Sequence, residues 1–306
     1  MELVNQHHYK VSLVCQLFGH CRQAFYQSKV DIEAEVNKER KIIKAVEEIR
    51  KEAPRIGGYK LWLMLNSLFG NEFVLGRDSF FRILRRNKLM QPKPKARHTT
   101  NSNHRYHKWK NLIKGINLLK PNQLWVADIT YIPLSNGDIS YLHLITDAYS
   151  HKIIGWELSD SLKASSTQKA LQMAIDQALA MQGGTHLYGL IHHSDRGVQY
   201  CCDAYVAQLQ FYGITISMTE DYKPTDNAIA ERSNGIIKTE CIYPLKTLPT
   251  LAQAWFIISN YIEFYNNRRP HMSIGYKVPS VVHNEQGMQK QMWRNKIYDK
   301  NNLLEF

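Results

Sequence analysis

Three acidic residues of this sequence have the types and the spacing that could support chemistry. Asp128 ends the apolar segment LWVA, Asp195 follows the apolar run in IHHSDRG, and Glu231 lies within a helical pattern. Asp195 and Glu231 are separated by 35 residues, numbers 196–230. Carboxylates on three separate elements can share two divalent metal ions, an arrangement that supports phosphodiester cleavage and transfer. We therefore expect a metal-dependent site for phosphodiester chemistry.

The overall charge indicates the kind of substrate. The chain has 306 residues, with 39 Lys and Arg against 27 Asp and Glu, which gives a net charge of +12. Such a surplus concerns partners rather than fold. An acidic pocket in a basic protein favours an enzyme that acts on DNA or RNA. The length allows two or three domains, and the hydrophobic fraction of 44% is typical of globular proteins.

Several other classes of protein are disfavoured by the sequence. No run approaches the ~18 apolar residues of a membrane span. The first residues, MELVNQHHYK, lack the apolar region of a signal peptide, so a cytoplasmic location is expected. The five cysteines include no CxxC pair, which argues for reduced thiols rather than a disulfide framework or a zinc site.

The first 92 residues have two segments with helical periodicity. In residues 11–27, apolar positions at helical spacing are followed by FGH and a second short helix, so a helix-turn-helix and a plain helical hairpin are equally open. Residues 31–53 are predicted to form a connecting helix. Residues 56–90 repeat the theme, and the second helix is expected to contact DNA rather than be an ordinary solvated face. Its expected DNA-binding residues are Arg82, Arg85 and Arg86.

A basic segment joins these helices to the rest of the chain. No Asp or Glu occurs from Ser79 to Ala127, and residues 93–120 have the proline and polar content of a linker. A solvated linker does not need such one-sided charge, whereas Lys and Arg near phosphates release counterions and strengthen binding. We expect DNA contacts from Lys93, Lys95 and Arg97.

After Pro121 the pattern becomes that of an α/β fold. Three apolar strand patterns come first, followed by a helix, a strand, a helix, a short strand and two closing helices. This is the order of the ribonuclease-H-like fold, with a mixed five-stranded sheet and helices. The predicted division is 1–50 and 51–92 for two small helix-turn-helix-like parts, 93–120 for the basic linker, 121–285 for the catalytic core and 286–306 for a C-terminal tail.

Several motifs in this core resemble those of a known family. WVADITYI, HHSDRGVQY, DNAIAE and YNNRRPHMSIGY, with the 35-residue gap, resemble the insertion-sequence transposases of OrfB type in the DDE transposase and retroviral integrase superfamily. The resemblance covers nearly the whole chain. It implies that Asp128, Asp195 and Glu231 are the catalytic residues and the ligands of two Mg²⁺ or Mn²⁺ ions.

The resemblance also implies an activity and partners. It implies cleavage at the ends of a mobile element and strand transfer into target DNA by a bacterial, nucleoid-associated protein. A homo-oligomer on DNA and a fusion with an upstream reading frame are further expectations. Two alternatives remain: another ribonuclease-H-like nuclease, and a non-catalytic DNA-binding relative of the transposases.

The helix that carries Glu231 suggests further site residues. Asn234 and Lys238 fall at +3 and +7 and are expected on the same face, where a DNA phosphate would lie. Glu240 is nine residues from Glu231, half a turn out of phase, and is expected to point away. The expected core side of this helix carries Ile229 and Ile236.

Other polar residues near the motifs have competing interpretations. Arg268 and Arg269 are candidates for DNA contact, although their segment could instead cap a helix before a proline. Asp147 is interpreted as a turn residue at a strand exit. His192 and His193 are expected to be structural, because Mg²⁺ prefers oxygen ligands.

Overall fold

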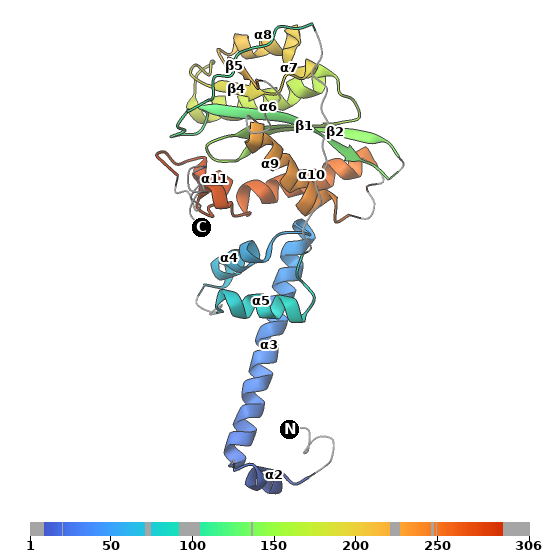
Figure 1. Ribbon diagram of the computed structural model, residues 1–306, viewed down its shortest axis with the longest axis vertical. Coiled ribbons are helices and arrows are strands. Elements are labelled where there is room, and N and C mark those ends of the chain that lie inside the picture. Colours follow the sequence, from blue (N-terminus) through green and yellow to red (C-terminus); the bar gives the residue numbers. More distant parts are fainter. Residues whose placement is uncertain are drawn as a thin grey trace, which may run out of the picture. The chain divides into compact units, whose positions relative to one another are not determined.

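The computed structural model describes residues 9–19, 21–70, 75–91, 105–135, 137–220, 227–245, 248 and 250–289. The chain divides into two compact units (Figure 1). The smaller unit contains residues 1–51 and 75–89, and the larger contains residues 52–74 and 90–306. Among the described residues, no helix is long and apolar enough to cross a lipid bilayer.

The secondary structure described in the smaller unit is helical. Its helices are α2 (Val11–Leu17), α3 (Arg22–Glu52, of which residues 22–51 belong here) and α5 (Arg77–Arg86). Asn87 Nδ2 donates to Glu39 at 2.7 Å, and Arg50 Nη2 donates to the Leu89 carbonyl at 2.7 Å, so the end of α5 is tied to α3. The buried apolar side chains of this unit are Cys15, Ile42, Val46, Ile49, Phe80 and Leu84.

One expectation for the N-terminal region, that of two separate helices, is wrong. The short second helix after FGH and the connecting helix over residues 31–53 are one continuous helix of 31 residues. No Gly or Pro interrupts residues 22–52, so the helix continues until it approaches Pro54. The predicted boundary between residues 50 and 51 stays a prediction; in the structure, residues 75–89 group with residues 1–51.

The larger unit is built on a mixed five-stranded sheet. Its strands are β1 (Leu124–Pro133), β2 (Ile139–Asp147), β3 (Ile153–Ser159), β4 (Ile191–Ser194) and β5 (Thr215–Met218). The strand order is β3-β2-β1-β4-β5. The first three strands form an antiparallel meander, and β4 and β5 join parallel to β1. This confirms the expected ribonuclease-H-like fold class.

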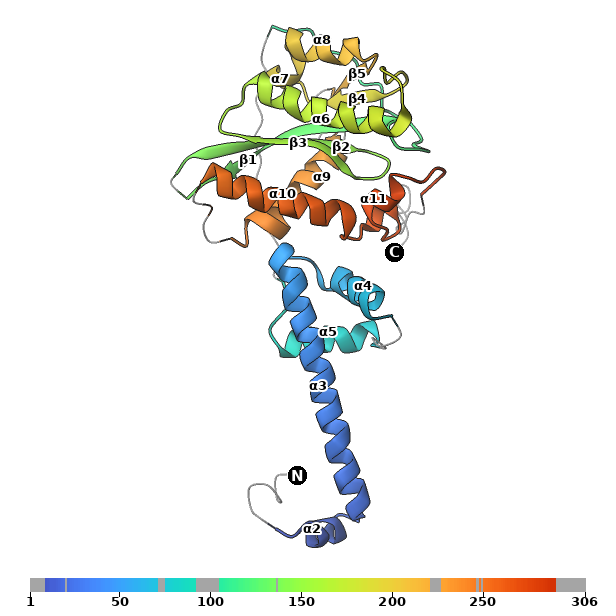
Figure 2. The same cartoon turned by 180° about the vertical axis from the view of Figure 1, so that it is seen from behind.

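Helices cover both faces of the sheet (Figures 1 and 2). One face carries α6 (Ala164–Gln182), α7 (Val198–Cys201) and α8 (Asp203–Phe211). The other carries α9 (Ala228–Ile237), the π-helical turn η3 (Lys238–Ile242), α10 (Leu251–Asn267) and α11 (Pro279–Val282). Helix α4 (Gly58–Phe69) and the short helix η4 (Met272–Ile274) also belong to this unit.

Alternation along β1 decides what each face of the sheet receives. Trp125 and Ala127 belong to the large core that includes α6 and α8 residues, whereas Leu124 and Val126 pack with Ala230 of α9. Because successive strand residues point to opposite faces, Asp128 shares the face of Leu124 and Val126, toward α9.

Helix α6, on the face of the sheet opposite α9, makes a close backbone contact with β3. A Cβ atom at Gly155 of β3 would lie 2.1 Å from the Ala170 carbonyl oxygen of α6. Only glycine permits backbones to approach so closely, so Gly155 is required for α6 to pack on this strand.

The end of the described chain is held against the core. The Gly287 N–H donates to the Leu119 carbonyl at 2.6 Å, and the Tyr149 hydroxyl donates to the Gly287 carbonyl at 2.9 Å. Residues 286–289, which the predicted division places in the C-terminal tail, are therefore packed on the larger unit. The rest of that tail lies outside the described residues.

Candidate active site

Two of the three candidate carboxylates lie at neighbouring strands. Ala127 of β1 pairs with Ser194 of β4 in parallel register, and Asp128 and Asp195 are the next residues in each case. Adjacent strands lie about 4.8 Å apart, so the two backbones place these residues side by side. The Asp195 carboxylate accepts a hydrogen bond from the Gly197 N–H at 2.9 Å, and a Cβ atom at Gly197 would clash with it.

Helix α9 brings the third candidate to the same end of the sheet. Its two asparagines attach it to β1: Asn234 Nδ2 donates to Asp128 Oδ2 at 2.7 Å, and Asn227 Nδ2 donates to the Ala127 carbonyl at 3.1 Å. Glu231 lies between these two anchors and is exposed. The buried residues of α9 are Ala230, Ser233, Asn234 and Ile237. Of the two isoleucines expected on the core side, Ile229 is partly buried and packs against the core, and Ile236 is partly buried.

The charges of the three carboxylates act on one another. The pKa of Asp128 is raised to about 7, first by burial and then by the negative charge of Asp195, with a smaller contribution from Glu231. Hydrogen bonds from the Asn234 side chain and the Ile129 N–H oppose this rise in pKa. Clustered carboxylates that raise one another's pKa favour the binding of a cation.

The chemistry of this site fits a hard divalent cation. Its donors are carboxylate oxygens, which Mg²⁺ and Mn²⁺ prefer. Two amide oxygens beside them, Oδ1 of Asn227 and Oδ1 of Asn234, are buried without a hydrogen-bond partner among the described residues. In the part of the chain that the structure describes, no three His, Cys, Asp or Glu side chains converge on one metal position. The structure therefore provides the donors and the negative charge, and not a closed three-ligand cage.

Lys238 lies on the Asp128 side of this site. It is half-buried at the start of η3, and burial lowers its pKa while the charge of Asp128 raises it. The expected neighbourhood of Lys238 and the carboxylates is thus present. Its contact with DNA stays a prediction. The expected contact of Asn234 with DNA also stays a prediction; in the structure Asn234 is buried and its side chain donates to Asp128.

Glu240 points away from the site, as expected, into a buried ionic network. Arg269 Nη2 and Nε donate to the two Glu240 oxygens at 2.7 and 2.8 Å. Lys60 Nζ of α4 and the Tyr261 hydroxyl donate to the same carboxylate at 3.2 and 2.9 Å. Only 2% of Arg269 is exposed, and its guanidinium is bound to Glu240, so its expected contact with DNA stays a prediction that the structure does not support.

The remaining predicted DNA-binding residues lie in several places. Arg268 is exposed and forms an ion pair with Glu52. Arg82, Arg85 and Arg86 are exposed on α5 of the smaller unit, and Arg86 pairs with Glu39. Their role in DNA binding stays a prediction. Another three predicted contacts fall outside the described residues: Lys93, Lys95 and Arg97.

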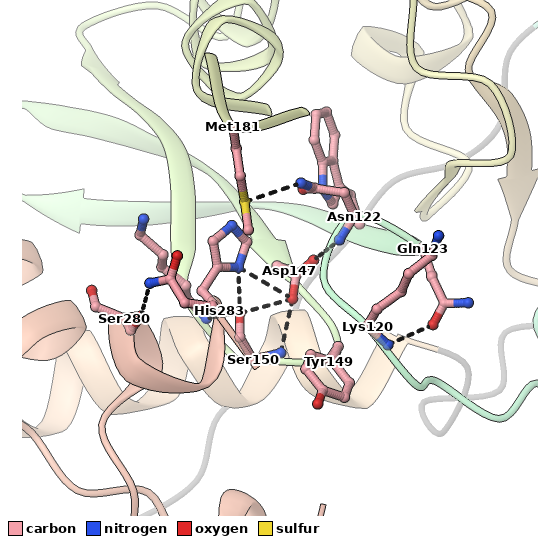
Figure 3. Close-up of polar contacts among 12 residues, drawn as sticks. Lys120, Asn122, Gln123, Asp147, Tyr149, Ser150, Met181, Ser280 and His283 are labelled. Atoms are coloured by element: carbon pink, nitrogen blue, oxygen red, sulfur yellow. Dashed lines mark hydrogen bonds and ion pairs between the residues drawn. The ribbon is translucent and has the colours of Figure 1, made fainter. Parts of the chain in front are cut away.

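Asp147 is a structural turn residue, in agreement with its interpretation from the sequence. It is fully buried and accepts hydrogen bonds from the Asn122 N–H and from the N–H and hydroxyl of Ser150, each at 2.8 Å. His283 Nδ1 lies 2.9 Å from the Ser150 hydroxyl, and Figure 3 shows both side chains turned toward Asp147. These contacts close the turn after β2.

The two histidines before Asp195 are also structural. The Tyr205 hydroxyl lies 2.9 Å from His192 Nε2, and His193 Nδ1 lies 2.8 Å from the Ser217 hydroxyl. Both side chains are buried. Burial lowers the pKa of His192 to about 3, so it packs as a neutral ring.

The fold of the larger unit is that of an integrase core. Models of the integrase core domain match residues 119–224 and 212–279. A protein of insertion element IS600 from Shigella sonnei is 32% identical over 280 residues, covering 88% of this chain and 96% of that protein. A protein assigned as a transposase for IS986/IS6110 of Mycobacterium tuberculosis is 31% identical over 227 residues, covering 74% and 80%. The chain belongs to the insertion-sequence transposases with an integrase core domain.

Two further comparisons extend the similarity. The InsF transposase of insertion sequence IS3fB from Escherichia coli is 34% identical over 166 residues, covering 54% of this chain and 55% of that protein. Among solved structures, the HTLV-2 integrase catalytic core domain in complex with magnesium has a TM-score of 0.42 and 21% identity, covering 55% of this chain and 99% of that one.

Proposed function

We propose that this chain cuts and joins DNA at the ends of a mobile element, with Asp128, Asp195 and Glu231 holding two divalent cations. The observation that carries the proposal is the gathering of these three carboxylates at one end of the sheet, where burial first and then the charges of Asp195 and Glu231 raise the pKa of Asp128 to about 7. Removing such a cluster from water is unfavourable unless a cation neutralises it. Membership of the transposase family agrees with this chemistry.

Each residue of the proposed site has its own task. When bound, the two cations supply Lewis-acid activation for an in-line displacement at phosphorus. Asp128 and Asp195 present carboxylate oxygens from adjacent strands, and Glu231 presents a third carboxylate from α9. Asn234 fixes the orientation of Asp128 through the 2.7 Å hydrogen bond. Lys238 provides a positive charge on the Asp128 side, where it can attract a DNA phosphate.

The partners follow from the same proposal. The substrate is DNA, both the element ends and the target, and the protein acts as a homo-oligomer on that DNA. Displacement by a water or a 3′-hydroxyl makes no covalent bond between protein and DNA, so no Ser or Tyr nucleophile is needed. Mg²⁺ or Mn²⁺ is the proposed cofactor, since all three ligands are hard oxygen donors.

The proposal is tested by removing one negative charge at a time while keeping side-chain shape. Asp128→Asn, Asp195→Asn and Glu231→Gln should each abolish Mg²⁺-dependent cleavage and strand transfer of element-end DNA while sparing DNA binding. Asp176→Asn, at an exposed position of α6, is the matched control and should keep wild-type activity. A variant of the trio that keeps near-normal strand transfer removes that residue from the site.

A binding measurement separates loss of metal from loss of chemistry. Millimolar Mg²⁺ or Mn²⁺ should raise the thermal midpoint of the wild type, because a ligand bound only by the native state stabilises it. Asp195→Asn should respond less. Wild-type protein that binds DNA but never cuts it with either metal would instead be a non-catalytic relative.

A further inference from the structure

Residues 105–114, here called the edge segment, lie beside the outer strand of the sheet. The Met218 N–H of β5 donates to the Lys110 carbonyl at 3.3 Å, and the Leu112 N–H donates to the Ser217 hydroxyl at 2.9 Å. Because residue 110 lies opposite 218 and residue 112 opposite 217, the edge segment runs antiparallel to β5. The sequence predicts a basic linker here, whereas these residues cover an otherwise open sheet edge.

The edge segment is anchored by side chains as well as backbone. Trp109 packs against the core cluster between the sheet and α6. The Asn111 N–H donates to Glu220 Oε1 at 3.0 Å, and Lys114 forms an ion pair with Glu220 Oε2 at 2.8 Å. The segment is therefore held at a fixed place along β5.

The direction of the edge segment brings its basic half toward the candidate active site. Residues before Lys110 run past Met218, toward the carboxyl ends of β4 and β5. Met218 pairs with Ser194, and Asp195 follows Ser194, so Asp195 lies at this same end of the sheet. Burial raises the pKa of the Cys201 thiol, the charge of Asp195 raises it further, and the charges of Lys108 and Arg196 lower it, so Asp195 and Lys108 both lie near this thiol.

The charged side chains of residues 105–110 in the edge segment are all positive and exposed. Arg105, Lys108 and Lys110 are exposed, and residues 105–120 contain no acidic residue. Lys108 lies near the same thiol as Asp195, Lys110 lies opposite Met218, and Arg105 precedes them in the same segment. Basic side chains at this end of the sheet match the phosphates that flank a scissile phosphodiester.

We propose that Arg105, Lys108 and Lys110 form a phosphate-binding surface that positions the DNA strand entering the site beside Asp195. This inference rests on the proposed function. It assigns to the edge segment a task at the reacting strand, distinct from general affinity for DNA along the whole basic stretch. The three residues belong to the segment that is packed on β5, so their proposed role does not depend on the position of the preceding part of the basic stretch.

Lys108→Ala and Lys120→Ala make a matched pair of variants. Both lysines are exposed and both changes remove one charge, but Lys120 precedes the amino end of β1, whereas Asp195 follows the carboxyl end of β4. Lys108→Ala should lower strand-transfer efficiency several-fold and reduce the salt slope of DNA binding by up to about 0.9 on a log–log plot. Lys120→Ala should change neither, and Lys108→Arg should restore both. Equal behaviour of the two alanine variants at unchanged thermal midpoints overturns the proposal.

A cross-linking experiment reports position without relying on activity. In a Cys21→Ser background, Lys108→Cys should form a disulfide with DNA that has a thiol tethered to a phosphate beside the cleavage position. Lys120→Cys should not. Cross-linking of residue 108 only to distant phosphates, or a change of oligomeric state in Lys108→Ala at unchanged DNA affinity, would assign this surface to another contact. If wild-type protein cuts DNA and these results fail, the edge-segment proposal alone is wrong.

Discussion

Asp128 and Glu240 are two acidic residues of one domain whose neighbours give them opposite charge environments. Around Asp128, burial and the carboxylates of Asp195 and Glu231 raise the pKa to about 7. Burial would also raise the pKa of Glu240, but Arg269, Lys60 and the Tyr261 hydroxyl hold it at about 2. The net effect of burial and neighbouring charge thus favours the protonated form of Asp128 and the ionised form of Glu240.

The difference separates a binding site from a structural support. A buried carboxylate with matched partners has all its interactions within the protein, so it fixes elements in place. A buried carboxylate whose pKa is raised by burial and by neighbouring carboxylates is a candidate for function, because perturbed groups of this kind gather at binding and catalytic sites. The same helical stretch, α9 continued by η3, carries both kinds of carboxylate nine residues apart.

Breaking the ionic network around Glu240 should produce the largest change in stability. Arg269→Ala leaves the Glu240 carboxylate buried with fewer partners and should lower the free energy of unfolding by about 3–5 kcal/mol. Urea unfolding measures this. Arg268→Ala, which breaks an exposed ion pair, is the control and should change stability by ~1 kcal/mol or less. Equal losses in the two variants would contradict the structural role of the network.

This network changes how Glu240 variants should be read. From the sequence alone, Glu240→Ala is expected to affect strand transfer far less than Lys238→Ala. The structure predicts instead that Glu240→Ala damages folding, because it leaves Arg269 buried without its partner carboxylate. Comparing these two variants therefore tests the site only when unfolding is measured alongside activity.

Removing the charge of Asp128 should raise the stability of the folded state rather than lower it. The folded pKa of Asp128 is about 7, above the ~3.9 of an unfolded Asp, so the folded state binds the proton more tightly. Stability from this group is present below pH ~4 and is lost as pH rises toward 7. Asp128→Asn should therefore raise the thermal midpoint at pH 8 in EDTA, and raise it less at pH 5. A stabilisation independent of pH would contradict this explanation. Added Mg²⁺ should reduce the difference in thermal midpoint between the variant and the wild type.

The smallest effect is expected from the hydrogen bond that opposes the raised pKa. Asn234→Ala removes the donor to Asp128 Oδ2, so the pKa of Asp128 should rise further. The acid limb of Mg²⁺-dependent cleavage should move to higher pH, and metal affinity should fall on the order of tenfold or more. Ser233→Ala, a neighbouring buried position that does not bond Asp128, should leave the pH profile unchanged. Identical pH profiles for Asn234→Ala and wild type would rule out this role for Asn234.

The order of elements in the core could be predicted from the sequence because it depends on local patterns. Apolar strand runs and the helical periodicity of residues 164–182 and 251–267 specify the elements, and the confirmed fold class follows from their order. The catalytic roles of Asp128, Asp195 and Glu231 stay a prediction, with their placement at one end of the sheet in its favour.

Long-range partners could not be predicted from the sequence. Lys60 is 180 residues from Glu240, and Arg269 is 29 residues away, so no local pattern connects them. For the same reason the packing of the edge segment near β5 could not be predicted, because its contacts join residues more than 100 positions apart. Asn234 could have been recognised, since its position at +3 from Glu231 also suits a ligand-orienting amide.

The spacing of the Glu240 partners along the chain has a consequence during protein synthesis. A ribosome delivers Lys60 and the strands first, then α9 and Glu240, and Arg269 only 29 residues later. Until Arg269 emerges, docking the end of α9 would bury Glu240 without its principal partner, which is strongly unfavourable. The helix with the third proposed ligand therefore becomes stable on the sheet late in translation. A ribosome-bound fragment that ends before Arg269 should not contain an assembled active site.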